Sequence, residues 1–162
     1  MQLTRFSDYA LRITLYLAVN DDRLVSVEQI SHAYGISRHH LIKIVQLLTE
    51  LGIVEAVRGR RGGMRLAKSP EAINVGELVR RTEPHMDLVE CFNMKTNTCP
   101  IAPACGLKGA LFEAQRAFLE SLDRHTLADF VPNREKLAPL WERAEKRNRR
   151  QMEKLTPSKP GG

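Results

Sequence analysis

The chain has 162 residues, of which 43% are hydrophobic and 27% charged, a composition typical of a globular domain. This composition excludes collagen, a coiled coil and bulk disorder. No run of about 18 apolar residues occurs, and the chain enters a periodic segment without the apolar stretch of a signal peptide. We therefore expect a soluble, cytoplasmic protein that does not bind a membrane.

The net charge of +6 is unevenly distributed. Residues 1–68 carry +4, residues 69–131 carry −3 and residues 132–162 carry +5. The last segment resembles a basic helix that runs into a disordered end, and such a charged tail is weak evidence for a specific DNA site. The function therefore has to be inferred from motifs rather than from net charge.

The first half of the chain contains three predicted helices. Apolar residues recur at helical spacing over 7–19, with Ser7 as the expected N-cap. Ser26 and Gln29 form a capping-box pattern before a short helix that ends at Gly35. Ser37 can cap the third helix, whose inner stripe consists of Leu41, Ile44, Val45 and Leu48. Two short helices joined around a glycine predict a helix-turn-helix.

A β-hairpin follows this pair of helices. Residues 53–57 are typical of a strand, residues 58–63 form an Arg- and Gly-rich turn, and residues 64–67 are typical of a returning strand. We interpret the hairpin as the wing of a winged helix. The predicted fold class is mainly α with a small β-hairpin wing, combined with a long C-terminal dimerisation helix.

The second half divides into three further segments. Asn74 and Glu77 form another capping pattern before a helix that Pro84 ends. Beyond residue 106, apolar residues form a long stripe that favours packing against a second copy, with packing on its own domain as the alternative: Leu107, Leu111, Ala114, Phe118 and Leu122. We expect a DNA-binding domain at 1–84, a cysteine-rich cluster-binding loop at 85–106, a dimerisation helix at 107–131 and a basic, partly disordered tail at 132–162.

The third helix carries the residues expected to contact double-stranded operator DNA. Ser37 and the amides of the helix N-terminus suit phosphate, and the longer side chains of Arg38, His39, His40 and Lys43 suit base edges. A solvated helix face is the alternative, but the order of helices and hairpin favours DNA.

In the wing, Arg58, Arg60 and Arg61 lie among glycines, which suits entry into a narrow minor groove. The glycine patterns of nucleotide-binding enzymes are missing, so we do not expect an enzyme.

The chain has three cysteines, Cys91, Cys99 and Cys105, within fifteen residues. An odd, clustered set argues against disulfides. The spacing of these cysteines suits an iron–sulfur cluster. It differs from the Cys-x-x-Cys pairs of common zinc and redox sites. Unliganded thiols, a zinc site completed by His85 and a thiol redox sensor remain alternatives.

Four segments carry a resemblance to a known family: Leu3-Thr-Arg-Phe-Ser-Asp-Tyr-Ala-Leu-Arg12, Tyr34-Gly-Ile-Ser-Arg-His-His-Leu41, Val57-Arg-Gly-Arg-Arg-Gly-Gly-Met-Arg-Leu66 and Cys99-Pro-Ile-Ala-Pro-Ala-Cys-Gly-Leu-Lys108. Over roughly residues 1–131 the chain resembles the nitric-oxide-sensing repressors among the winged-helix, iron–sulfur-dependent bacterial regulators. The resemblance implies a homodimer that holds a cluster on Cys91, Cys99 and Cys105. It also implies a repressor that releases DNA when nitric oxide attacks the iron.

The same resemblance bears on the fourth ligand. The related regulators of iron–sulfur cluster assembly place a histidine three residues after the last cysteine as a ligand to a [2Fe–2S] cluster, whereas this chain has Lys108 there. The nitric-oxide sensors instead use an aspartate of the other subunit near the start of the first helix, where this chain has Asp8. The resemblance therefore favours [4Fe–4S] over [2Fe–2S]. Without it, Asp8 is explained as a carboxylate stabilised at a helix N-terminus.

Overall fold

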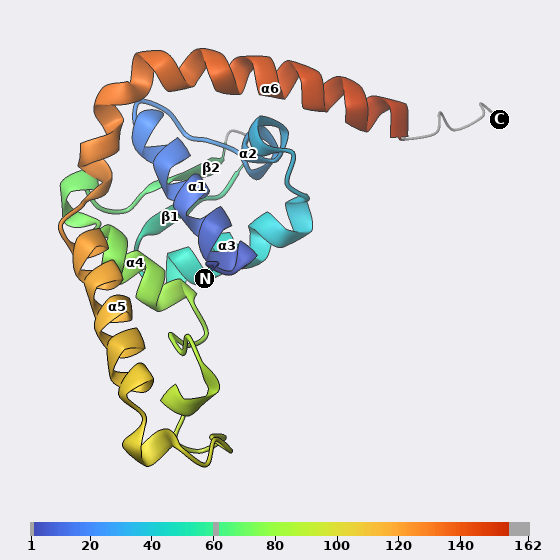
Figure 1. The fold of residues 1–162 in the computed structure, drawn as a ribbon. Coiled ribbons are helices and arrows are strands. Elements are labelled where there is room, and N and C mark those ends of the chain that lie inside the picture. Colours follow the sequence, from blue (N-terminus) through green and yellow to red (C-terminus); the bar gives the residue numbers. More distant parts are fainter. Residues whose placement is uncertain (1, 60–61, 156–162) are drawn as a thin grey trace.

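The computed structural model describes residues 2–59 and 62–155. A helical body with one hairpin is extended by two long helices that leave it in different directions (Figure 1). The elements are α1 (Arg5–Val19), α2 (Val27–Tyr34), α3 (Arg38–Glu50), β1 (Val54–Val57), β2 (Gly63–Leu66), α4 (Val75–Thr82), α5 (Gly106–Asp123) and α6 (Arg134–Leu155). The predicted fold class, mainly helical with a two-stranded wing, is confirmed.

Helix α1 forms the centre of the body. Ala10, Ile13 and Leu17 are fully or almost fully buried, because α3, α4, β2 and the 3₁₀ helix Leu127–Asn133 pack against this helix. The prediction that Ser7 is the N-cap is wrong. Thr4 holds that position with extended backbone, and its hydroxyl accepts the Ser7 amide at 3.3 Å. Ser7 lies inside the first turn and is buried.

The helix-turn-helix forms as the sequence predicts. Ser26 and Gln29 make both bonds of the capping box, and Gly35 ends α2 in the left-handed conformation at φ 67°. Glycine adopts this conformation without steric cost. The Ser31 hydroxyl donates to the Ile36 carbonyl at 2.7 Å, which satisfies a buried polar group and fixes the turn.

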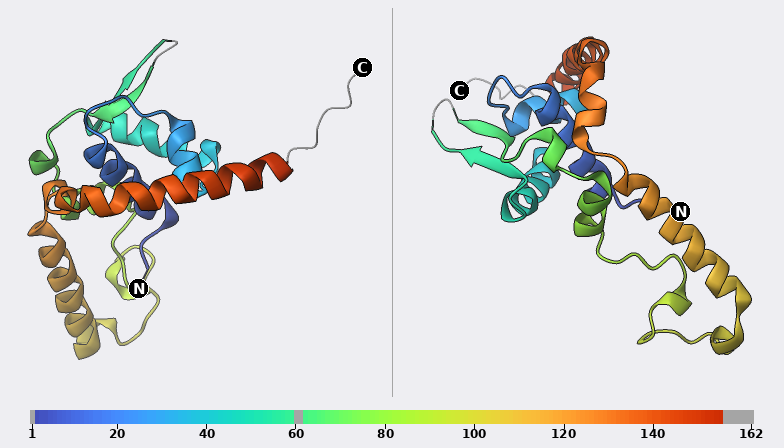
Figure 2. Two further views of the ribbon diagram at one scale, coloured as in Figure 1. Left: turned by 90° about the horizontal axis from the view of Figure 1, so that it is seen from above. Right: turned by 90° about the vertical axis from the view of Figure 1, so that its left-hand side faces the viewer.

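The wing is an antiparallel hairpin in which Val54 pairs with Leu66 and Val57 with Gly63. Met64 also exchanges two backbone hydrogen bonds with Val25, at 2.8 and 2.9 Å. The hairpin is therefore attached to the residues that precede α2, and strands β1 and β2 project from the body (Figure 2).

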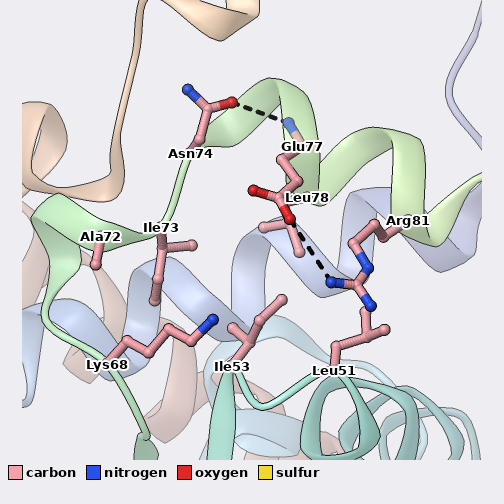
Figure 3. A pocket seen from close by; sticks show the side chains of 9 residues that line it. All are labelled: Leu51, Ile53, Lys68, Ala72, Ile73, Asn74, Glu77, Leu78 and Arg81. Carbon is pink, nitrogen blue, oxygen red and sulfur yellow. Dashed lines mark hydrogen bonds and ion pairs between the residues drawn. The ribbon is translucent and has the colours of Figure 1, made fainter.

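Helix α4 packs near the end of α3 and the start of the wing (Figure 3). The Asn74 side chain accepts the Glu77 amide at 2.9 Å and caps this helix, and Glu77 pairs with Arg81 at 3.6 Å. The cavity between these elements has a volume of only about 20 Å³. This is room for about one water molecule, so the cavity is a packing defect rather than a ligand site.

The end of α5 is clamped onto α4. Arg80 donates two hydrogen bonds to the Asp123 carboxylate, both at 2.6 Å, which lowers the pKa of Asp123 and raises that of Arg80. Backbone bonds from Val75 to the His125 carbonyl (2.9 Å) and from Leu127 to the Ile73 carbonyl (3.0 Å) continue the contact. Helix α5 ends at Asp123, so it is shorter than the helix predicted for residues 107–131.

Helix α6 folds back over α1 and α2, although the sequence alone predicts a partly disordered tail there. Trp141 is 9% exposed and lies 4.8 Å from the Tyr16 ring and 6.0 Å from the Tyr34 ring. Burial, followed by the Glu145 carboxylate that accepts its hydroxyl, raises the pKa of Tyr16 to about 12. Burial also raises the pKa of Tyr34. The predicted disorder of residues 156–162 lies outside the described residues.

We predict that Gly76→Ala weakens the α4–α5 clamp. An added Cβ would lie directly against the Asp123 carboxylate and within 3.0 Å of the Asp123 backbone nitrogen. The expected loss of unfolding free energy is about 1–3 kcal/mol, as for other overpacked sites.

The matched control is Gly109→Ala on α5, where a Cβ meets open space. That change should be neutral or stabilise the protein by about 0.5–1 kcal/mol, because alanine is the better helix former. Urea denaturation of both variants tests the prediction, and equal stabilities would contradict it.

Candidate nucleic-acid interface and cysteine segment

The outer face of α3 carries all five of the residues that the sequence assigns to DNA. Ser37, Arg38, His39, His40 and Lys43 are exposed. Ser37 caps the helix by accepting the His40 amide at 3.5 Å. The opposite face of α3 is buried in the core through Leu41, Ile44 and Leu48. Packing against α1 thus holds α3 with its polar face outward, where it is accessible to a groove of DNA.

Sequence reasoning missed two residues on the same face. Ile42 is 43% exposed, and Gln46 is exposed one turn further along α3. They follow His39 at spacings of three and seven, so helical periodicity could have identified them. An exposed isoleucine suits the methyl group of thymine, and a glutamine suits adenine.

The wing is described only in part. Arg58 is exposed at the end of β1, whereas Arg60 and Arg61 lie outside the described residues. Arg65 on β2 pairs with Glu55 on β1 at 3.0 Å.

The three cysteines lie in an extended segment between α4 and α5, at the end of the molecule remote from α6 (Figure 1). All three are free thiols of intermediate exposure. Glu90 accepts the Thr98 amide at 2.5 Å and the Thr98 hydroxyl at 2.6 Å, and these two bonds lower the pKa of Glu90. Glu90 directly precedes Cys91 and Thr98 directly precedes Cys99. These bonds therefore bridge the two ends of the longer of the two segments that separate the cysteines in sequence.

The donor set fits an iron–sulfur cluster. Cys105 is the N-terminal flanking residue of α5, and its side chain makes no capping bond. Cysteine binds the iron of such clusters as the thiolate. In this single chain, the described His, Cys, Asp and Glu residues do not converge in a group of three that could hold a metal ion. The match between these residues and an iron–sulfur cluster therefore rests on the chemistry of the three thiols. His85, the alternative zinc ligand, accepts a hydrogen bond from the Asp87 amide at 3.3 Å.

Asp8 lies on the first turn of α1, and among the described residues it forms no metal-binding group with the cysteines of its own chain. Its carboxylate pairs with Arg12 one turn later at 2.8 Å. The start of α1 is attached to the end of α4, since Glu83 accepts the Thr4 amide at 2.8 Å and the Thr4 hydroxyl at 3.1 Å. Glu83 leads into the cysteine segment, so this contact connects that segment to α1.

Comparison with known proteins identifies the family. The model of the Rrf2 family, described as an iron-dependent transcriptional regulator, matches residues 3–133. The chain belongs to the Rrf2 family. It is a transcription regulator and not an enzyme.

Curated relatives narrow this assignment. The chain is 50% identical over 141 residues to the HTH-type transcriptional regulator NsrR of Shouchella clausii, covering 86% of this chain and 95% of that protein. It is 47% identical over 141 residues to the NsrR of Bacillus subtilis, covering 86% and 97% respectively. The protein is thus an NsrR-like Rrf2 regulator.

Solved structures agree with the fold. CymR, the global cysteine regulator of B. subtilis, is 26% identical with a TM-score of 0.66, covering 82% of this chain and 97% of that chain. IscR of T. potens is 25% identical with a TM-score of 0.66, covering 82% and 88%. No helix among the described residues is both long and apolar enough to cross a membrane.

We predict that Arg38→Ala and His39→Ala each relax operator specificity. Loss of one contact to a base edge should cost about 1–3 kcal/mol of binding free energy and reduce discrimination at the contacted base pair. Titration of wild type and variants against an operator and its single-base substitutions measures this. Thr49→Ala, at the far end of the exposed face, is the control. Unchanged base preferences in both variants would contradict the assignment.

Proposed function

We propose that this protein is a homodimeric repressor in the bacterial cytoplasm that binds operator DNA and senses nitric oxide through an iron–sulfur cluster. Reaction of nitric oxide with the bound cluster (nitrosylation) would release the DNA. The observation that carries the proposal is the set of three free thiols between α4 and α5, in a chain about half identical to NsrR regulators. A [4Fe–4S] cluster, when bound, supplies iron that nitric oxide attacks.

The proposed domain division follows from this arrangement. Residues 1–84 bind DNA, residues 85–106 hold the cluster through Cys91, Cys99 and Cys105, residues 107–131 form the dimer contact and residues 132–162 form the basic tail. The DNA-contacting set is Ser37, Arg38, His39, His40, Lys43, Arg58, Arg60 and Arg61.

An exposed apolar surface on α5 supports the dimer. Leu107 is 66% exposed and Phe112 57% exposed, and both lie on the half of α5 that extends beyond the body. Burial of apolar surface contributes about 25 cal/mol for each Å² removed from water, so a second copy of α5 is a favourable partner. A two-fold dimer also places two recognition helices on successive major-groove faces.

Asp8 is the proposed fourth ligand, donated by the other subunit. Its pair with Arg12 is exposed and lies within one helix, and such pairs contribute only about 0.3–0.5 kcal/mol. Arg12 therefore does not prevent Asp8 from binding a metal, but it offers the carboxylate a partner once Asp8 is released. A carboxylate is a harder ligand than a thiolate, which makes Asp8 the ligand most readily lost.

The contacts around α1 explain how loss of Asp8 can reach the DNA. Helix α1 packs directly on α3 and on the wing strand β2, so a shift of α1 displaces both DNA-binding elements. The bonds between Thr4 and Glu83 join the same helix to the cysteine segment of its own chain. Release of DNA requires a coupling of about 1–3 kcal/mol between the two sites.

We predict that replacing any one of Cys91, Cys99 and Cys105 with alanine abolishes the cluster. Two thiolates do not suffice for a cluster that needs three protein thiolates. The described residues contain no other group of ligands that could replace the lost one. Iron and sulfide analysis of anaerobically purified protein, with absorption spectroscopy, measures the loss. An alanine variant with full iron and sulfide would contradict the assignment, and stoichiometric zinc in a colourless protein would favour the zinc alternative.

We predict that Asp8→Ala alters the nitric-oxide response, while Glu28→Ala does not. Glu28 is also an exposed first-turn carboxylate, on α2, so it matches the interaction of Asp8 with a helix dipole. Each change should cost about 0.3–1 kcal/mol of stability. Only Asp8→Ala should change cluster sensitivity to added thiol and the nitric-oxide concentration that releases DNA.

Parallel titrations of cluster-loaded wild type, Asp8→Ala, Glu28→Ala and Arg12→Ala measure these effects. Arg12→Ala removes the competing partner and keeps the carboxylate, so it should retain the cluster. Identical curves for wild type and Asp8→Ala would remove Asp8 from the mechanism.

A further inference from the structure

Helix α6 carries a strongly basic surface that the proposed sensor does not use. Within residues 143–151, the basic side chains are Arg143, Lys146, Arg147, Arg149 and Arg150, and all five are exposed. The only acidic residue in this stretch, Glu145, accepts the hydroxyl of Tyr16 at 3.0 Å. Within the described part of the chain, the ion pairs of α6 are those of Arg134 with Asp21 and Asp22.

The basic side chains are arranged along one flank of the helix. Arg143, Arg147 and Arg150 follow one another at spacings of four and three, and Lys146 lies beside them. At a rise of 1.5 Å per residue, this flank is about 10 Å long. We call these four residues the basic stripe. It lies beyond residue 133, where the match to the family model ends.

The fold places the basic stripe beside the helix-turn-helix. The Asn148 side chain donates to the His32 carbonyl at 2.8 Å, and it lies so close to Gly35 that an added Cβ there would be 3.3 Å from its nitrogen. Gly35 is two residues before Ser37, the first residue of the predicted DNA face. Helix α6 runs along α2 and continues past it (Figures 1 and 2).

The chemistry of this surface selects a polyanion as its partner. On α6, Trp141 is buried against α1 and α2 and Leu137 is partly buried, while Leu140, before the basic stripe, is 59% exposed. Residues 142–151 expose no large apolar side chain, although a helix that enters a lipid surface or a protein groove needs one. In a helix-turn-helix the first helix crosses the DNA backbone, and α6 lies against that helix.

We propose that the basic stripe binds phosphates of the DNA that flanks the operator core and so extends the interface of each subunit. The inference rests on the DNA binding proposed above. Its contribution is independent of base sequence, because arginine and lysine contacts to phosphate carry no sequence information.

Salt dependence on duplexes of two lengths tests the proposal. An operator is first selected from random-sequence duplexes with the full-length protein, and is then prepared as the trimmed core and as the core with random flanks. The double variant Arg147→Gln, Arg150→Gln is compared with an off-stripe control, Lys136→Gln, Arg149→Gln, which removes the same charge from exposed sites of α6 outside the basic stripe. A second variant, Arg143→Gln, Lys146→Gln, repeats the measurement at the other end of the stripe.

With the flanked duplex, each stripe variant should flatten the slope of log K against log salt by about 1.8, which corresponds to two phosphate contacts. The gain in affinity between 200 and 50 mM salt should shrink about three- to fourfold for each lost contact. The core duplex should bind all variants equally well, and the off-stripe control should behave as wild type on both duplexes.

Several results would overturn the inference. Slopes equal to wild type on the flanked duplex would show that the basic stripe faces solvent. An equal loss in the off-stripe control would show that only net charge matters. Stripe-dependent binding to phosphatidylserine vesicles with unchanged DNA slopes would assign it to a membrane. The proposed function fails only if wild type binds no duplex selectively, so the two failures are distinguishable.

Discussion

The contact between Arg80 and Asp123 sets the geometry on which the rest of the molecule depends. It joins α4, part of the DNA-binding body, to the end of α5, and Gly76 leaves room for the carboxylate between them. The start of α4 and the end of α5 are fastened together here, and the cysteine segment connects the end of α4 to the start of α5. This clamp and the bonds between Thr4 and Glu83 attach the two ends of the α4–α5 unit to the body and so help to position the thiols.

A second set of contacts gives the DNA face its rigidity. Helix α1 is buried by α3, α4 and β2, and its Thr14 hydroxyl is satisfied by the Ala10 carbonyl at 3.0 Å. A close-packed core transmits displacement rather than absorbing it. Helix α1 is thus a suitable element for coupling a ligand at Asp8 to the recognition helix.

The exposed surfaces complete this arrangement. Leu107 and Phe112 of α5 are more than half exposed in the single chain, whereas Trp141 of α6 is buried. The two long helices therefore differ in what they offer to partners. Helix α5 offers apolar surface suited to a second copy, and α6 offers charge suited to nucleic acid.

The sequence by itself determined the local structure of the DNA-binding half. Capping at Ser26 and Asn74, the turn at Gly35 and the apolar stripe of α3 depend on residues within one or two turns, so their pattern is visible in the chain. The exposed face of α3 was predictable for the same reason. The three cysteines were also recognisable as candidate ligands, because their number and clustering are properties of sequence.

Only the tertiary structure decided the contacts between distant residues. Thr4 rather than Ser7 caps α1, where Glu83, 79 residues away, also holds Thr4. The tail becomes an anchored helix because Trp141 finds Tyr16 and Tyr34, and the clamp requires Arg80 and Asp123 to meet across 43 residues. Periodicity and spacing describe which face of an element is apolar, but they do not specify which other element will cover it.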